Sequence, residues 1–160
     1  MKAIYFYEGL IGRYVLEETD GCLTRMWVGD RVALAPEDVE VRETPLLQEA
    51  RKQLDSYFSG QLQEFTLPFS LKGTEFQKKV WMVLRNIPYG TTITYGELAG
   101  RVGNVKASRA VGMANSRNPL PVFIPCHRVI GTGGKLTGYT GGLNIKEILL
   151  QLESRQKSKI

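Results

Sequence analysis

The chain has 160 residues with 42% hydrophobic and 23% charged residues, an ordinary globular mix that excludes disordered and collagen-like classes. Its length suits one domain or a small pair. No apolar run approaches the roughly 18 residues of a membrane span. The N-terminal apolar patch is broken by Glu8 and Arg13, so it lacks the uninterrupted core of a signal peptide. We therefore expect a soluble cytoplasmic protein with no membrane partner.

The net charge of +5 is unevenly distributed along the chain. Residues 1–72 carry 8 basic and 12 acidic side chains, whereas residues 73–160 carry 13 and 4. From Leu98 to Lys146 there are seven Lys or Arg and no acidic residue. This pattern predicts a scaffold over 1–72 and a second unit over 73–160 that binds a polyanion such as nucleic acid. The alternative is a solvated basic face without a partner.

The first half has the pattern of a small antiparallel sheet followed by a helix. Three short runs are rich in β-branched and aromatic residues, and Asp20-Gly21 provides a turn between the last two. A helical apolar stripe then begins at a proline and ends before Gly60. The predicted elements are strands over 3–7, 13–19 and 23–28, a helix over 45–58, and an irregular connector over 65–72.

Capping boxes open two helices in the second half. Thr74-x-x-Gln77 predicts a helix that ends before Pro88, and Thr94-x-x-Glu97 predicts a short helix over 95–102. Asn104 is expected to cap a third helix over about 105–116, with Ala107, Ala110, Val111 and Ala114 on its inner side.

The last two of these helices have a helix-turn-helix pattern, since they are short and joined across a glycine-containing turn. Many such helix pairs bind nothing, but this one lies in the window without acidic residues. If the unit binds DNA, the helix over 105–116 is the recognition helix. It and the residue after it would then present Lys106, Ser108, Arg109, Asn115 and Arg117 to the DNA.

A proline-rich segment and a glycine-rich loop follow. Three prolines between residues 119 and 125 forbid a helix, so we expect a rigid extended segment over 118–130 with residues 122–124 buried. Residues 131–142 include six glycines and form a loop whose backbone can approach a bulky group closely. Asn144-x-x-Glu147 is expected to cap a last helix, which frays into a basic tail from Ser154.

Cys126 is the candidate reactive residue, because the only histidine of the chain, His127, follows it directly. A neighbouring imidazole and the Arg128 guanidinium would raise the thiolate fraction, and the prolines upstream would fix the direction of the thiol. The alternatives are a buried inert cysteine, a core histidine, and an arginine that only contacts a phosphate or carboxylate. One histidine and two distant cysteines do not suffice for a zinc site, so we expect no metal. Cys22 has no histidine nearby and is expected to be structural.

A Cys–His pair can serve a protease, an acyltransferase or an alkyl acceptor. A protease usually has a separated histidine with an orienting Asn or Asp, and it has no use for a basic helix-turn-helix. A thiol beside a DNA-binding unit instead favours chemistry on a DNA base. The remaining alternatives are a cysteine hydrolase, and a DNA-binding module that recognises alkylated DNA or regulates transcription without chemistry.

These residues resemble a known family, the methylated-DNA–protein-cysteine methyltransferases or O6-alkylguanine-DNA alkyltransferases. The heptapeptide Ile124-Pro-Cys-His-Arg-Val-Ile130 resembles the family's active-site signature, which is highly specific. The likeness extends over about 74–153 and is weak before that. It is carried further by Pro88-Tyr-Gly90, Thr94-Tyr-Gly-Glu-Leu-Ala99, Ser108-Arg-Ala-Val-Gly112, Asn118-Pro119, Tyr139-Thr-Gly-Gly-Leu143, Lys146-Glu147 and Glu153.

The resemblance implies a ribonuclease-H-like α/β subdomain followed by a mainly α-helical one with the helix-turn-helix. It implies repair of double-stranded DNA by direct reversal, in which Cys126 irreversibly takes the alkyl group from O6 of a flipped-out guanine. His127 would act through a water as the base, oriented by Glu153, and no cofactor is implied. We expect such a protein to act once, as a monomer.

The resemblance also assigns roles around the reacting base. Asn118 would support the active-site turn, Tyr95 would crowd the phosphate 3′ to the target, and Arg109 would fill the gap left in the stack. Arg128 is also expected on the DNA side, and the guanine pocket would be walled by Tyr139, Thr140, Gly141 and Val129. The chain departs from the family at Val105, where a proline is common; because Asn104 remains to cap the helix, we expect little harm.

Overall fold

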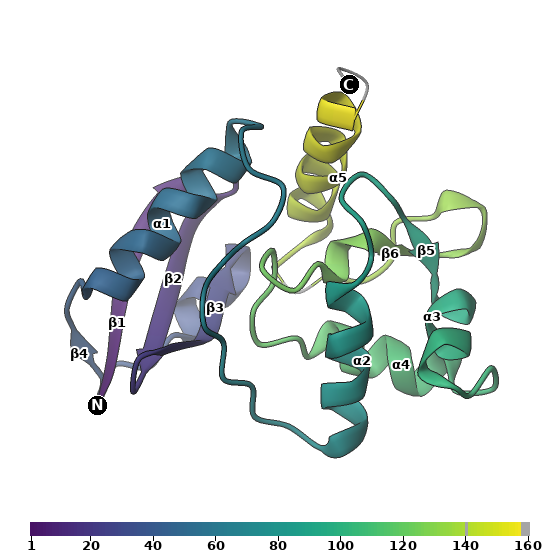
Figure 1. The fold of residues 1–160 in the computed structure, drawn as a ribbon, viewed down its shortest axis with the longest axis horizontal. Helices are drawn as coiled ribbons and strands as arrows, with labels where there is room; N and C mark the ends of the chain where they lie inside the picture. The colour runs from purple at the N-terminus through teal and green to yellow at the C-terminus, as the bar shows by residue number, and fades with distance from the viewer. Residues whose placement is uncertain (140, 158–160) are drawn as a thin grey trace.

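The computed structural model describes residues 1–139 and 141–157. Figure 1 shows a twisted sheet with one covering helix in the N-terminal half, and a group of shorter helices in the C-terminal half. Within the described part of the chain, no helix is both long and apolar enough to cross a membrane. The predicted fold class, an α/β part followed by a mainly α-helical part with a helix-turn-helix, is confirmed.

The sheet has the order β3-β2-β1-β4 and contains the three predicted strands. Asp20 and Gly21 both have positive φ, at 49° and 85°, as a tight two-residue hairpin turn requires. The expectation of a purely antiparallel sheet is wrong, because β4 pairs with β1 in parallel. β4 has only two residues, which is too short to show a periodic pattern. The strands are β1 (Lys2–Gly9), β2 (Gly12–Thr19), β3 (Cys22–Val28) and β4 (Glu40–Val41).

Helix α1 (Pro45–Phe58) has the predicted bounds and packs on the sheet (Figure 1). The Thr44 side chain caps it by accepting a hydrogen bond from the Leu47 amide, and it donates one to Glu18 of β2. The buried face of α1 belongs to a hydrophobic core that continues into the C-terminal half. The helix therefore connects the sheet to the rest of the molecule.

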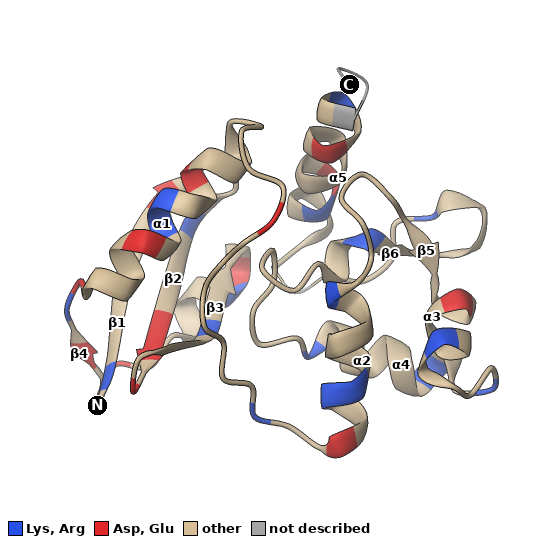
Figure 2. Cartoon of the chain, viewed as in Figure 1, with Lys and Arg blue, Asp and Glu red and all other residues tan. Residues whose placement is uncertain are grey.

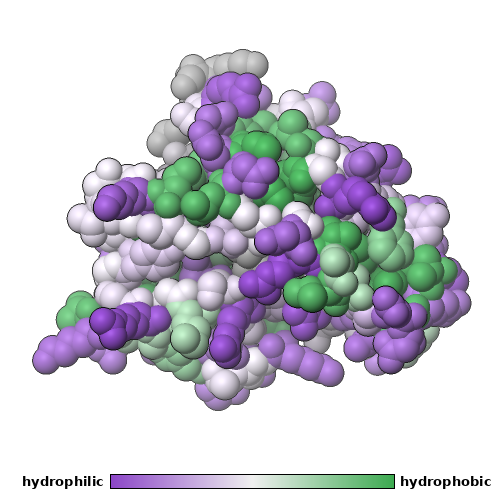
Figure 3. Space-filling view, turned by 180° about the vertical axis from the view of Figure 1, so that it is seen from behind, coloured by the Kyte–Doolittle hydropathy of each residue, from purple (hydrophilic) through white to green (hydrophobic). Residues whose placement is uncertain are grey.

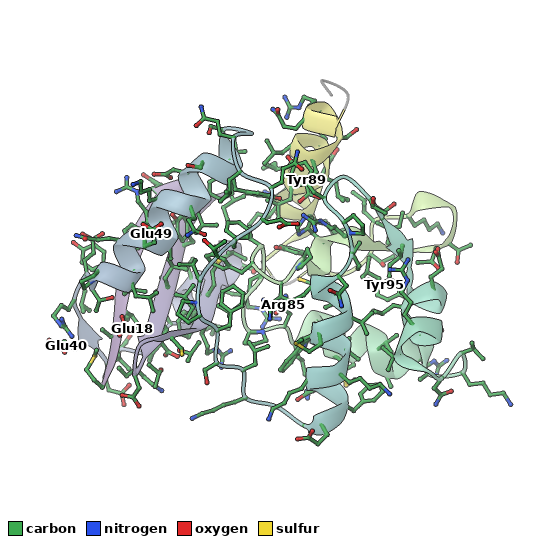
Figure 4. All side chains as sticks on the ribbon, in the orientation of Figure 1. Glu18, Glu40, Glu49, Arg85, Tyr89 and Tyr95 are labelled. Carbon is green, nitrogen blue, oxygen red and sulfur yellow. The ribbon has the colours of Figure 1, made fainter. Side chains whose placement is uncertain are left out.

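The connector between the halves runs along β3. Leu23 exchanges backbone hydrogen bonds with Pro68 and Ser70, and Phe69 lies under the guanidinium of Arg85, 5.1 Å from it. Figure 4 labels Arg85 at the end of α2 (Glu75–Arg85), facing this connector. The connector is irregular, as predicted, but it is fixed by these contacts.

The helix-turn-helix is present, and its second helix starts later than expected. Both capping boxes form, and α3 (Tyr95–Val102) has the predicted bounds. Helix α4 (Ser108–Ser116) has no side-chain cap. Asn104 instead accepts a hydrogen bond from the Lys106 amide, which closes a turn before the helix, so the predicted cap is wrong. Ala110 is exposed, contrary to its predicted inward position.

The segment over 118–130 is not fully extended. It contains a 3-10 turn at Cys126–Arg128, followed by β6 (Val129–Ile130), which pairs in parallel with β5 (Ile93–Thr94). Residues 122–124 are buried, as predicted. Helix α5 (Leu143–Lys157) begins before Asn144 and continues past Ser154, so the predicted cap and the early fraying are both wrong.

Candidate active site

The loop that carries Cys126 is held by Asn118. Its side-chain amide donates to the Ile124 carbonyl at 2.7 Å, and its side-chain oxygen accepts from the Leu120 amide at 3.0 Å. Between these two points Val122 has φ 75°, a strained conformation for a β-branched residue. Pro125 then forms a tight turn in which the Cys126 amide donates to the Ile124 carbonyl at 2.7 Å. The proline-fixed direction of the thiol is thus reinforced by the asparagine.

The thiol of Cys126 is buried and protonated at neutral pH. Burial raises its pKa to about 11, while hydrogen bonding with Asn118 and the charge of Lys146 oppose the rise. The expectation that the Arg128 guanidinium activates the thiol is wrong, because that group is bonded elsewhere. The cation that acts on Cys126 is Lys146.

Lys146 is fully buried on the first turns of α5. Its ammonium donates to the carbonyls of Val129 and Thr137, at 2.7 and 2.8 Å. Burial lowers the pKa of Lys146, and the nearby Cys126 partly restores it. From the sequence, Lys146 was counted among the basic residues and as part of the family resemblance, but it was given no role at the thiol. The spacing could have indicated its burial, because Lys146 precedes Glu153 by seven residues and therefore lies on the same face of the helix.

His127 is completely buried and is paired with Glu153. Its Nε2 lies 2.8 Å from Glu153 Oε2. Burial raises the pKa of Glu153, but the hydrogen bonds from His127 and Arg128 and the charge of Arg128 together hold it well below its usual range. An ionised carboxylate only accepts, so Nε2 carries the proton and Nδ1 keeps its lone pair. Nδ1 has no hydrogen-bond partner among the described residues. Burial also lowers the pKa of His127, which keeps the ring neutral.

Arg128 is an internal ion-pair partner and is not available to DNA, so its predicted role on the DNA side is wrong. Its Nε and Nη2 donate to the two oxygens of Glu153 at 2.8 and 2.9 Å, and Nη1 donates to the Ile87 carbonyl at 2.7 Å. The side chain is buried against Tyr89. Of the alternatives weighed from the sequence, the carboxylate contact is the one observed.

Asn115 was also predicted to contact DNA, and this too is wrong. It is 3% exposed on the inner face of α4, and its amide lies 3.4 Å from the Cys126 carbonyl as a donor. The residue faces inward because α4 packs against α2, where the indole of Trp81 donates to the Ala114 carbonyl at 2.9 Å. Asn115 therefore links the helix-turn-helix to the Cys126 turn.

The other predicted DNA contacts lie on the surface. Ser108 is half-buried at the first position of α4, Arg109 is exposed next to it, and Lys106 is exposed in the turn before the helix. Arg117 is exposed just after α4, where it lines a cleft of about 770 Å³ together with residues of β2, β3 and the connector. Figure 2 shows most acidic residues in the N-terminal half and mainly Lys and Arg around α2, α3 and α4.

Tyr95 and Tyr139 lie around the glycine-rich loop. Tyr95, labelled in Figure 4 at the start of α3, accepts a hydrogen bond from the Thr137 hydroxyl at 3.2 Å. The hydroxyl of Tyr139 is buried and has no hydrogen-bond partner among the described residues. Burial raises the pKa of Tyr139, and the charge that Cys126 can carry adds to the rise.

Val129, Thr140 and Gly141 were also predicted to wall the guanine pocket. The carbonyl of Val129 is bonded to Lys146, and Gly141 packs so closely on Val28 that a Cβ there would come within 2.5 Å of its side chain. Thr140 lies outside the described residues. Among those that are described, no three His, Cys, Asp or Glu side chains cluster as metal ligands.

Family models and relatives match nearly the whole chain. The DNA-binding domain of 6-O-methylguanine DNA methyltransferase matches residues 75–155, and the ribonuclease-like domain of the same protein matches residues 14–71. A methylated-DNA–protein-cysteine methyltransferase of Methanosarcina acetivorans is 57% identical over 116 residues, covering 72% of this chain and 74% of the relative. A Mycobacterium leprae protein of the same name is 48% identical over 146 residues, covering 91% and 88%.

Solved structures agree with these matches. The crystal structure of Mycobacterium tuberculosis O6-methylguanine methyltransferase has a TM-score of 0.89 and 40% identity, covering 98% of this chain and 94% of that one. A structure of Mycobacterium tuberculosis OGT in complex with DNA also has a TM-score of 0.89 and 40% identity, covering 96% and 94%. Together with the Cys126 site, these matches show that the chain belongs to the 6-O-methylguanine DNA methyltransferase family, the methylated-DNA–protein-cysteine methyltransferases.

Proposed function

We propose that this chain carries out the family's direct reversal of DNA alkylation with Cys126 as the alkyl acceptor. The observation that carries the assignment is a buried thiol beside Asn118 and Lys146, with His127 next in the chain and held by Glu153. The Cys126 sulfur attacks the alkyl carbon on O6 of guanine. The S–C bond forms as the C–O bond breaks, and guanine leaves with the electron pair and takes up a proton.

His127 is the base that receives the thiol proton, through a water. Its neutral ring and its free Nδ1 suit this role, because Nε2 is committed to Glu153. A base is needed since a thiol whose pKa is about 11 has almost no thiolate at neutral pH. The charge of Lys146 then stabilises the thiolate as it develops.

Transfer of the alkyl group to sulfur inactivates the protein. The product is a thioether, which offers water no good leaving group, so each molecule repairs one base. The chain is therefore a stoichiometric acceptor that acts once.

The base must leave the duplex before it can reach a buried thiol, at a cost of a few kcal/mol. The recognition helix α4 would lie in the minor groove with exposed Arg109 in the gap left by the base, which offsets part of that cost. Tyr95 would press on the 3′ phosphate, with Lys106, Ser108 and Arg117 completing the DNA contacts. The flipped O6-alkylguanine would lie against Tyr139, Val129 and the loop that holds Gly141.

The protein would act in the cytoplasm as a monomer. Its two subdomains would be residues 1–72, the scaffold, and residues 73–160, which bind DNA and accept the alkyl group. Hydrophobic surface on the face drawn in Figure 3 is split into separate patches by hydrophilic side chains, which supports a monomer.

Transfer of a labelled methyl group from duplex DNA that contains O6-methylguanine tests the assignment. We expect the label on the Cys126 peptide, none on Cys126→Ala, and undiminished labelling of Cys22→Ala, which removes the other cysteine. A label retained by Cys126→Ala would refute the acceptor. Binding of the methylated duplex with no transfer would instead support recognition without chemistry.

A further inference from the structure

Tyr57 belongs to the N-terminal half, yet its hydroxyl reaches the active site. It lies on the last turn of α1, is fully buried, and donates a hydrogen bond to Glu153 Oε2. The same oxygen lies 2.8 Å from His127 Nε2. Tyr57 and His127 therefore share one acceptor atom, which also accepts a hydrogen bond from Arg128 Nη2 at 2.9 Å.

The ring of Tyr57 is fixed by aromatic neighbours on several sides. Its centroid lies 5.3 Å from Phe65, 5.7 Å from Phe58 and 6.1 Å from Tyr89, which meets it edge to face at 84°. Figure 4 labels Tyr89 beside α5, the helix that carries Glu153. Burial, and then the carboxylate itself, raise the pKa of Tyr57, so the phenol remains a donor at any pH at which the protein works.

We propose that Tyr57 is a positioning residue for alkyl transfer, which acts through Glu153 on His127. This role of Tyr57 rests on the proposed function of His127 as the base. The tyrosine holds the Glu153 carboxylate in place, and it takes up part of the negative charge that Oε2 would otherwise present to the imidazole. The N-terminal half thereby contributes a functional group to the active site, beyond its role as a scaffold.

Removal of the hydroxyl has two predicted effects on His127. The Glu153 oxygen is less firmly placed, so transfer is slower at neutral pH. That oxygen also becomes a stronger acceptor for the protonated ring, so the pKa of His127 rises. The cations of Arg128 and Lys146, which lower this pKa, are the same in the variant. The pH at which transfer fails on the acid side must then move upward.

The test measures single-turnover transfer from methylated duplex DNA against pH for Tyr57→Phe. The matched control is Tyr14→Phe, since Tyr14 is also a fully buried tyrosine of the N-terminal half, and its hydroxyl has no partner among the described residues. We expect Tyr57→Phe to slow transfer about three- to tenfold, a fraction of the hundredfold or more that a general base supplies. Its acid limb should move to higher pH and its DNA affinity should be unchanged. Tyr14→Phe should match the wild type.

A double-mutant cycle with Glu153→Gln shows whether the effect passes through the carboxylate. In that background Tyr57→Phe should slow transfer no further; independent, multiplicative losses would overturn the proposal. If Tyr57→Phe does not fold, 3-fluorotyrosine at position 57 retains the packing and donates more strongly. It should move the acid limb to lower pH, and an unmoved limb would overturn the proposal.

Failure of the inference can be told apart from failure of the proposed function. Undiminished transfer by His127→Gln would overturn the base assignment itself. Slow transfer by His127→Gln together with wild-type rates and pH profile for Tyr57→Phe would overturn only the role of Tyr57.

Discussion

Replacement of Glu153 by glutamine should destabilise the protein far more than removal of a surface carboxylate. Glu153 accepts two hydrogen bonds from Arg128 and one each from His127, Tyr57 and the Gly90 amide. An amide in its place turns an N–H₂ group toward some of these donors and leaves the buried Arg128 cation without its counter-charge. Breaking a buried pair in this way costs about 3–5 kcal/mol. For a chain of this size that corresponds to a fall in Tm of roughly 6–20 °C.

Urea unfolding and calorimetry of Glu153→Gln against Glu147→Gln measure this cost. Glu147 lies on the same helix, is exposed, and bonds only to Gln151 among the described residues, so its replacement should cost below about 0.5 kcal/mol. Adding Arg128→Met to Glu153→Gln should recover part of the loss, because the unpaired buried cation is removed. Equal stabilities of the two single variants would show that the buried Glu153 carboxylate stabilises the protein no more than an exposed one does.

Three further predictions concern the thiol, the glycine-rich loop and the recognition helix. Burial raises the pKa of Cys126 from 9.0 to about 11, so the thiol ionises first in the unfolded chain. The stability contributed by the protonated thiol is fully present below pH 9. As the pH rises to 11, the free energy of unfolding of the wild type should fall by about 2–3 kcal/mol relative to that of Cys126→Ala. Parallel urea-unfolding curves across this range would contradict it. Gly141 has φ 106°, and a Cβ added there would lie 2.5 Å from the Val28 side chain, whereas Gly133 also has positive φ but open space around it. Gly141→Ala should therefore lower Tm more than Gly133→Ala. Equal losses of Tm would refute the close contact. Arg109→Ala should slow transfer from duplex DNA about tenfold, with unchanged Tm and unchanged transfer from the free O6-alkylguanine base, where nothing is flipped. Unaltered duplex kinetics would exclude its role in flipping.

Features of this fold that depend on neighbouring residues could be predicted from the sequence. The capping boxes at Thr74 and Thr94 use side chains and amides three residues apart, and both helices begin where predicted. The Asp20-Gly21 turn and the proline-initiated α1 are equally local. β4 could not be found, since its two residues are defined only by their pairing with β1.

The burial of polar side chains could not be predicted from the sequence, because it depends on partners far away in the chain. Arg128 and Asn115 lie in a basic stretch and look like DNA contacts, but Glu153 and the Cys126 carbonyl, 25 and 11 residues away, draw them inward. Tyr57 looked like one more apolar residue of a helical stripe. Its partner is 96 residues distant, so no local pattern indicates it. Cys126 and His127 were predicted because they are adjacent, but the lysine that acts on the thiol was not.

Counting turnovers distinguishes a single transfer to Cys126 from repeated catalysis. Intact-mass spectrometry after incubation with a large excess of O6-methylguanine duplex should show the gain of one methyl group per chain, mapped to Cys126. Repaired DNA should equal protein in amount and should not increase with time. Repair that exceeds the amount of protein, or repair without a mass gain, would show that Cys126 is not a single-use acceptor.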